Sequence, residues 1–217
     1  MKSEFRYSKQ ILPEATRHSS NLEDIRVGIR RNEHLFEQCI EVIKEALVTS
    51  EFHLQVSTIT SLHAGLFDEG GGLLRVNEIF IKGTTFIAPP APEVPDLLAD
   101  MCLYVNSRLG GGKPLPKTDA IHVSAYALWR TNWIHPFADG NGAVARALCY
   151  ILLSVALDSL LPGIPTIPEQ IADSRDEYYM GLESADRAWR AGVVDTSRLE
   201  HMIDRMLNVQ LSGVRTA

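Results

Sequence analysis

Two apolar helical segments near the middle of the chain restrict the folds that this sequence can adopt. Residues 121–133 are hydrophobic on most faces of a helix, and so is the stretch from Gly142 through Leu153, which follows a short polar turn. A helix that is apolar all round has to be buried. We therefore expect these segments to be the two central helices of an all-α fold, a helical bundle.

Weaker helical patterns surround this pair. Apolar residues recur at three- and four-residue steps within residues 35–47 and 59–66, which is typical of amphipathic helices. Further helices are expected near residues 96–103, 169–191 and 197–211. The remaining pattern is β-like: residues 76–81 and 84–87 predict two short strands of a small hairpin, with Lys82-Gly83 as the turn.

The sequence shows no internal repeat and no strong domain boundary. We expect one main body, residues 34–217, and an N-terminal segment, residues 1–33, that packs on it as a separate helix. The three cysteines, Cys39, Cys102 and Cys149, fit neither a disulfide framework nor a zinc site, so buried free thiols in a reducing compartment are expected.

Charge and hydropathy exclude several classes of partner. A net charge of −6 and a pI of about 5.6 argue against a nucleic-acid surface, which usually needs a basic face. The N-terminus lacks the apolar core of a signal peptide, and the longest apolar run is too short and too polar for a membrane span. We therefore expect no nucleic-acid partner, no membrane partner and a cytoplasmic location.

The turn between the two central segments has the residues of an anion-binding site. Gly140, Asn141 and Gly142 open the second helix, where unpaired N–H groups and the helix dipole favour phosphate. The two glycines allow close approach of the backbone, and the amide side chain of Asn141 adds a donor. Arg146 follows Gly142 by one helical turn and can reach back to a terminal phosphate.

Two further residues of the turn supply groups for catalysis. His135 precedes the glycines, and an imidazole with an ordinary pKa of about 6.5 suits a general base. Asp139 offers the single carboxylate that is the usual protein share of a Mg²⁺ shell beside phosphates. Each residue alone is more often structural, but their order at a loop-to-helix junction indicates a site. His63 and His122 have apolar neighbours and are interpreted as packing histidines.

The run His-Pro-Phe-Ala-Asp-Gly-Asn-Gly at residues 135–142 resembles the signature of the Fic family, H-P-F-x-(D/E)-G-N-G-R-x-x-R. The resemblance extends to residues 62–75, to the strand pair and to residues 86–95, and it covers roughly residues 19–190 in all. It implies an all-α Fic fold with a β-hairpin flap. It also implies transfer of a nucleoside monophosphate, usually AMP from ATP, to a hydroxyl side chain of a target protein.

The resemblance assigns roles to individual residues. His135 is the expected general base for the target Ser, Thr or Tyr, Asp139 holds Mg²⁺ on the α- and β-phosphates, and Phe137 anchors the turn in the core. Residues 140–142 form the anion cradle, and Arg146 holds the γ-phosphate. Tyr178 is expected near the nucleotide. The expected target-docking flap consists of Ile79, Phe80, Ile81, Lys82, Gly83 and Thr84.

One position departs from the signature, because Ala143 stands where the family has its first arginine. Alanine is a good helix former, so the fold is expected to persist. Loss of one charged contact to phosphate typically costs about 1.5–3 kcal/mol. The departure therefore bears on nucleotide affinity, on catalytic rate or on which nucleotide is used.

A second motif lies upstream. Residues 19–24, Ser-Ser-Asn-Leu-Glu-Asp, resemble the family's inhibitory motif, (S/T)-x-x-x-E-(G/N), with Asp24 departing at the last position. The same pattern is also compatible with a simple helix start of the capping-box kind. As an inhibitory motif with Ser19 at its first position, it implies that Glu23 pairs with Arg146 and denies that guanidinium to the γ-phosphate.

Several functions fit this sequence. The leading one is a Mg²⁺- and ATP-dependent protein adenylyltransferase held back by its own N-terminal helix. The same site could transfer UMP, GMP, phosphate or phosphocholine, or hydrolyse an AMP-modified protein with water positioned by Glu23. A catalytically weak nucleotide-binding or interaction module, marked by Ala143, is the alternative from another class. The oligomeric state is open, a homo-oligomer included.

Overall fold

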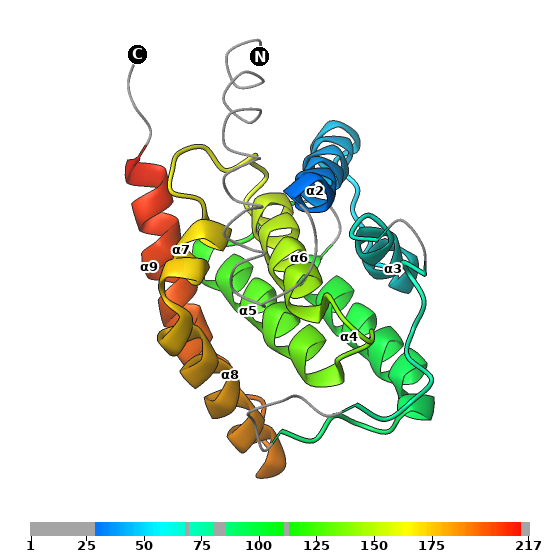
Figure 1. The fold of residues 1–217 in the computed structure, drawn as a ribbon. Coiled ribbons are helices and arrows are strands. Elements are labelled where there is room, and N and C mark those ends of the chain that lie inside the picture. Colours follow the sequence, from blue (N-terminus) through cyan, green and yellow to red (C-terminus); the bar gives the residue numbers. More distant parts are fainter. Residues whose placement is uncertain (1–28, 68–69, 80–85, 111–112, 214–217) are drawn as a thin grey trace.

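The computed structural model describes residues 29–67, 70–79, 86–110 and 113–213 (Figure 1). The elements are α2 (Ile29–Thr49), α3 (Val56–Ala64), η1 (Ala91–Glu93), α4 (Val94–Leu109), α5 (Lys117–Ile134), α6 (Asn141–Ala156), α7 (Ile167–Asp173), α8 (Arg175–Arg190) and α9 (Ser197–Ser212). Secondary structure in these ranges is helical apart from a lone bridge residue, Ile87. This confirms the all-α fold.

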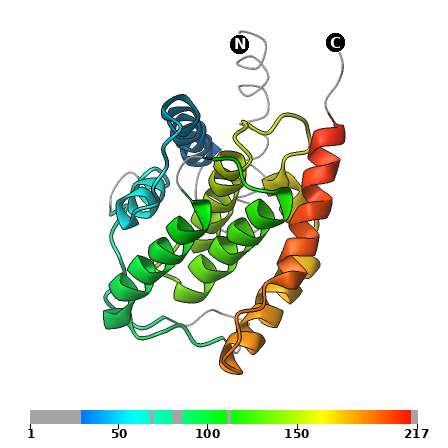
Figure 2. The same ribbon diagram turned by 180° about the vertical axis from the view of Figure 1, so that it is seen from behind.

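The two apolar segments become α5 and α6, and they form the most extensive helix pair of the described fold. Fifteen of the sixteen residues of α6 are buried, which agrees with its apolar pattern on every face. Helices α2 and α3 pack on α6, α4 lies beside α5, and α8 and α9 cover the other flank (Figures 1 and 2). The expectation of two central helices is confirmed.

The outer helices agree with the sequence except near residue 174. The single helix predicted over residues 169–191 is two helices, α7 and α8, because Ser174 leaves the helical region with φ −113° and ψ 42°. Bonds to α9 fix the direction of α7: Gln170 Nε2 donates to Met206 O at 2.8 Å, and Ile167 N–H donates to Gln210 Oε1 at 3.0 Å. These tertiary contacts have no signature in the local sequence.

The predicted strand pair is only partly within the described residues. Residues 76–79 belong to no strand, and the residue before them is bound to the turn after α5, since Arg75 N–H donates to Pro136 O at 2.9 Å. Phe80, Ile81, Lys82, Gly83 and Thr84 lie outside the described residues, as do Ser19 and Glu23. The hairpin flap and the inhibitory motif therefore stay predictions.

The N-terminal division also stays a prediction. Helix α2 begins at Ile29 and continues through residue 33, where the sequence placed the boundary of the main body. Its buried face is formed by Leu35, Phe36, Cys39, Ile40 and Ile43, which confirms the amphipathic pattern. Across the described ranges, no helix has both the length and the apolar character needed to cross a bilayer.

Candidate active site

The turn between α5 and α6 has an unusual backbone at both ends. His135 ends α5 in the left-handed region with φ 51°, and its N–H donates to Thr131 O at 3.0 Å. Gly140 precedes α6 with φ 77°, and a Cβ there would approach Leu66 Cδ1 to 3.1 Å and Phe67 Cε2 to 3.2 Å. Both the positive φ and the crowding favour glycine at this position.

Phe137 anchors the turn in the core, as the resemblance implied. Its side chain is fully buried and stacks on the ring of His63, with centroids 3.7 Å apart and planes at 6°. The amide of Asn141 closes the turn: Nδ2 donates to Phe137 O at 2.8 Å, and Oδ1 accepts from Phe137 N–H at 2.9 Å. Both the nitrogen and the oxygen of the Asn141 side-chain amide thus bond within the turn, whereas the sequence suggested that this amide would donate to an anion.

His135 is held in the tautomer of a general base. A carbonyl oxygen only accepts, so the 3.2 Å contact between His135 Nδ1 and Asn132 O places the proton on Nδ1 and leaves Nε2 with a lone pair. Burial, with a smaller contribution from the charge of Arg75, lowers the pKa of His135 to about 4, against opposing contributions from the hydrogen bond to Asn132 and from Asp139. The ring is therefore neutral at pH 7, although its proton affinity is weaker than that of an ordinary imidazole.

Asp139 is an exposed residue of the turn. Its Oδ1 accepts the Gly140 N–H at 2.8 Å, which fixes the side chain beside the start of α6. Among the described residues no group of three or more His, Cys, Asp and Glu side chains could hold a metal. Mg²⁺ commonly takes one or two carboxylates and completes its shell with water and phosphate oxygens. A lone exposed carboxylate at a helix start fits that ion.

The backbone of Asp139 is held by His63, a residue that sequence reasoning treated as packing alone. Gly72 N–H donates to His63 Nδ1 at 2.8 Å, so the proton is on Nε2, which donates to Asp139 O at 3.0 Å. Burial lowers the pKa of His63, which keeps the ring neutral and preserves both bonds. His63 thereby connects the loop after α3 to the backbone of the expected metal ligand.

Tyr178 supports the base through a second residue that the sequence did not single out. Asn132 Nδ2 donates to the buried Tyr178 hydroxyl at 3.0 Å and to Leu128 O at 2.7 Å. The backbone carbonyl of the same Asn132 accepts the His135 Nδ1 proton. Tyr178 thus lies on the base side of the site, and its expected contact with a nucleotide stays a prediction.

The first turns of α6 carry the remaining signature positions. Gly142 and Ala143 are buried in the first turn, and Arg146 lies one turn further, with 1 % of its surface exposed. Residues four apart share a helix face, so the Arg146 side chain projects from the same face as Gly142. The turn thus gathers His135, Asp139 and the start of α6 at one end of the central helix pair.

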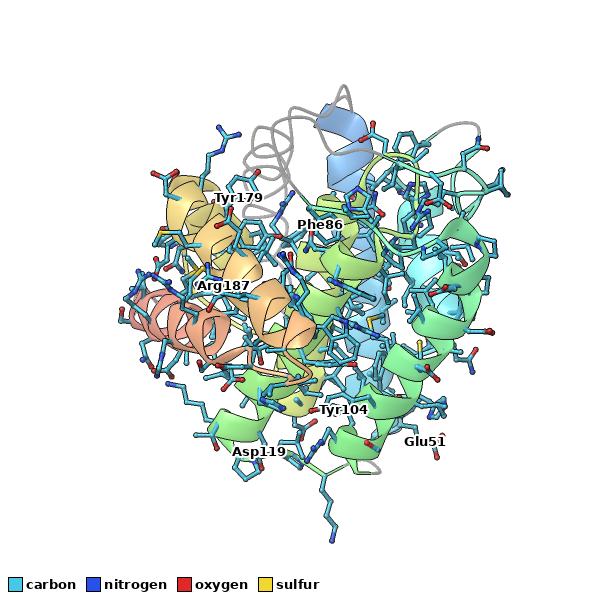
Figure 3. The ribbon with its side chains drawn as sticks, turned by 90° about the horizontal axis from the view of Figure 1, so that it is seen from below. Glu51, Phe86, Tyr104, Asp119, Tyr179 and Arg187 are labelled. Carbon is cyan, nitrogen blue, oxygen red and sulfur yellow. The ribbon has the colours of Figure 1, made fainter. Side chains whose placement is uncertain are left out.

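His122 is remote from this site. Its Nε2 lies 2.9 Å from Tyr104 Oη and its Nδ1 lies 2.8 Å from Glu200 Oε1, which links α4, α5 and α9. Figure 3 shows Tyr104 with Asp119 on the side of the domain away from Phe86 and Tyr179. His122 therefore joins helices at another face, and we assign it no part in the site.

A cavity of about 300 Å³ opens beside Asp139. Apolar side chains form most of its wall, and Leu73 and Val76 are 69 % and 84 % exposed. The lining residues are His63, Phe67, Gly70, Leu73, Leu74, Arg75, Val76, Asn77, Ile79, Ala138 and Asp139. The cavity thus lies between the turn and the segment that leads to residue 79.

Fold and turn together define a helical domain that places a neutral imidazole next to the N-terminus of a buried helix, where phosphate groups are favoured. The model of the Fic/DOC family matches residues 53–153. A Fido domain-containing protein of Dictyostelium discoideum is 30 % identical over 132 residues, which cover 61 % of this chain and 82 % of that protein. The chain belongs to the Fic family.

Two more distant proteins extend the comparison. The protein adenylyltransferase fic-1 of Caenorhabditis briggsae is 27 % identical over 147 residues, and the match covers 65 % of this chain but only 26 % of that protein. The crystal structure of a Fic family protein from Desulfovibrio desulfuricans G20 has a TM-score of 0.66 at 18 % identity, over 95 % of this chain and 65 % of that one. The structural likeness concerns the fold alone.

Proposed function

We propose that this chain is a protein adenylyltransferase, which transfers AMP from ATP to a Ser, Thr or Tyr hydroxyl of a target protein. The observation that carries the proposal is the state of His135, a neutral ring with Nδ1–H bound to Asn132 O and a lone pair on Nε2, in the turn that leads to the glycine-rich start of α6. The relative from C. briggsae, named a protein adenylyltransferase, supports the choice of reaction, although this chain spans about a quarter of its length.

The chemistry follows from the positions of these groups. His135 Nε2 accepts the proton of the target hydroxyl as its oxygen attacks the α-phosphorus of ATP; the bond to the β-phosphate oxygen breaks, and pyrophosphate leaves. Backbone N–H groups at the start of α6 stabilise charge on the phosphate oxygens. Asp139 would hold Mg²⁺, and the ion would supply positive charge against the phosphates of ATP. Such transfer depends mainly on positioning and on charge stabilisation.

Regulation by the N-terminal segment is part of the proposal. We propose that Glu23 pairs with Arg146 and keeps this guanidinium from the γ-phosphate. The burial of Arg146 supports it, because fully buried charged side chains are seldom found without a partner of opposite charge, and Arg146 is 1 % exposed. Replacement of Glu23 by glycine is therefore expected to raise label transfer. Residues 79–84 are proposed to bind the target segment by strand-like pairing.

A second candidate is a nucleotide-binding module with little transferase activity. Ala143 favours it, because a methyl group supplies neither charge nor a hydrogen-bond donor to a phosphate. The reverse reaction, hydrolysis of AMP from a modified protein with Glu23 positioning water, and transfer of another nucleotide or group use the same residues. The direction of the reaction and the nucleotide are decided by experiment.

Transfer of label from α-phosphate-labelled ATP to the chain itself tests these alternatives. We expect transfer by wild type that increases in Glu23→Gly and Ala143→Arg and is lost in His135→Ala. The exposed His201 of α9 offers a matched control, and His201→Ala should label like wild type. Equal labelling of His135→Ala and wild type would refute the assignment of the base. Tight ATP binding without transfer, even in Glu23→Gly, would favour the binding module.

A further inference from the structure

Arg75 is a buried charged residue of the connection between α3 and α4, with 6 % of its surface exposed. We propose that it is a positioning residue, which fixes both ends of the target-docking segment against the turn that carries the catalytic base. The inference rests on the proposed function for the role of that segment. The contacts that carry it join three separate parts of the chain.

The first set of contacts binds Arg75 to the turn. Arg75 Nε donates to His135 O at 2.7 Å, and Nη2 donates to Ile134 O at 3.3 Å. The backbone N–H of Arg75 donates to Pro136 O at 2.9 Å. Three consecutive carbonyl groups, those of residues 134–136, are thus bound by one residue that precedes them by about sixty positions.

The second set binds the two ends of the segment that contains residues 79–84. Arg75 Nη1 donates to Asn77 O at 3.2 Å, and Nη2 donates to Pro89 O at 2.6 Å. Asn77 and Pro89 are twelve positions apart, so one guanidinium joins the entry and the exit of the segment. Glu78 adds a second link between these ends, because its Oε1 accepts the Ala91 N–H at 3.1 Å.

Arginine suits this position for a geometric reason. A guanidinium has five N–H donors in a fixed planar fork, and here they serve carbonyl oxygens that belong to different parts of the chain. A lysine ammonium is a single point of charge and cannot span the same acceptors. Burial lowers the pKa of Arg75, with an opposing contribution from the charge of Glu78. A guanidinium starts so far above neutral pH that it stays protonated in proteins.

These contacts of Arg75 bear on the position of the target and not on the binding of the nucleotide. The acceptor hydroxyl has to come within hydrogen-bond reach of His135 Nε2, and the docking segment would hold the residues that flank it. Arg75 holds the two described ends of that segment, at Asn77 and Pro89, relative to the turn. Asp139 and the start of α6, which are proposed to bind the nucleotide, receive no hydrogen bond from the Arg75 side chain among the described residues.

Hydrogen–deuterium exchange of the full chain tests the inference without reference to activity. Arg75→Lys and Arg75→Gln are compared with wild type and with Arg130→Gln, which removes a guanidinium of nearly equal burial, 5 % exposed, that does not bind the turn. We expect faster exchange at the amides of residues 76–79 and 86–88 in both Arg75 variants. Arg130→Gln should leave these amides unchanged. Wild-type exchange in Arg75→Lys would overturn the proposal.

Self-labelling with α-phosphate-labelled ATP provides the functional measurement. Misplacement by about 1 Å can cost 10²-fold in rate, so we expect transfer by Arg75→Lys to fall by roughly that factor while its affinity for ATP with Mg²⁺ stays at the wild-type value. An equal loss of ATP affinity would contradict the inference that Arg75 acts on the position of the target and not on nucleotide binding. If wild type transfers no label, the proposed function fails, and the exchange data still decide the role of Arg75. Arg75→Lys keeps the charge and serves if Arg75→Gln does not fold.

Discussion

His63→Phe isolates the polar contribution of a histidine that sequence patterns alone would assign to packing. Phenylalanine keeps an aromatic ring against Phe137 but removes the acceptor of the Gly72 N–H and the donor to Asp139 O. Two hydrogen bonds at about 0.5–1.5 kcal/mol each give an expected loss of about 1–3 kcal/mol in the free energy of unfolding. His63→Ala also loses the stacking and leaves a cavity, so its loss should reach about 3–5 kcal/mol.

Urea unfolding followed by circular dichroism measures both variants. Because His63 holds the backbone of Asp139, we also expect His63→Phe to require more Mg²⁺ for half-maximal label transfer. Phe67→Leu is a control at a neighbouring ring, since Phe67 contacts His63 with centroids 4.8 Å apart but does not bond to the turn through a polar atom. A His63→Phe protein with wild-type stability and wild-type Mg²⁺ dependence would show that the two hydrogen bonds contribute nothing.

Two further predictions concern stability. The folded-state pKa of His135, about 4, lies below the unfolded value of about 6.5, so the unfolded chain binds the proton more tightly. The neutral ring therefore contributes up to about 3 kcal/mol to the free energy of unfolding. This contribution is complete above pH 6.5 and is lost as the pH falls towards 4. Urea titrations across this range should show a smaller loss in His135→Gln. Arg130 lies 4.2 Å from the Trp133 ring centroid and 4.5 Å from that of Trp189, and its Nε and Nη1 have no hydrogen-bond acceptor within the part of the chain that the structure describes. Arg130→Met loses a cation–π contact of about 0.5–2 kcal/mol and removes a desolvation penalty of about 1–3 kcal/mol, so thermal melting should show equal or greater stability; a marked loss would contradict this account.

The sequence predicts the core of the fold and the turn because their determinants are local. The apolar patterns of α5 and α6 specify burial whatever surrounds them. Within the turn, the left-handed Gly140 and the bonds from Asn141 to Phe137 involve residues at most four apart. A contiguous motif therefore contains most of the information that determines its own backbone.

The residues that support the turn could not be predicted in this way, because their contacts are long-range. His63 reaches Asp139 across 76 positions, Arg75 reaches His135 across 60, and Asn132 reaches Tyr178 across 46. A histidine among apolar helix residues and an arginine in a loop have ordinary structural explanations, and only the tertiary fold shows what their polar atoms bind. The direction of α7 also depends on long-range contacts, since its bonds to α9 span 43 and 36 positions.

These long-range contacts share one feature that bears on catalysis. The connection after α3 binds the turn twice: His63, with Gly72, holds the carbonyl of Asp139, and Arg75 holds the carbonyl of His135. The expected metal ligand and the expected base are thus fixed to the same stretch of chain that leads to the target-docking segment. Transfer requires base, phosphate and acceptor to meet within hydrogen-bond reach, and small displacements are costly. A single connection thus holds the backbone of the expected carboxylate through His63 and that of the expected base through Arg75, and Arg75 also binds Asn77 and Pro89 at the two ends of the proposed docking segment, so the base and the proposed target position are set together.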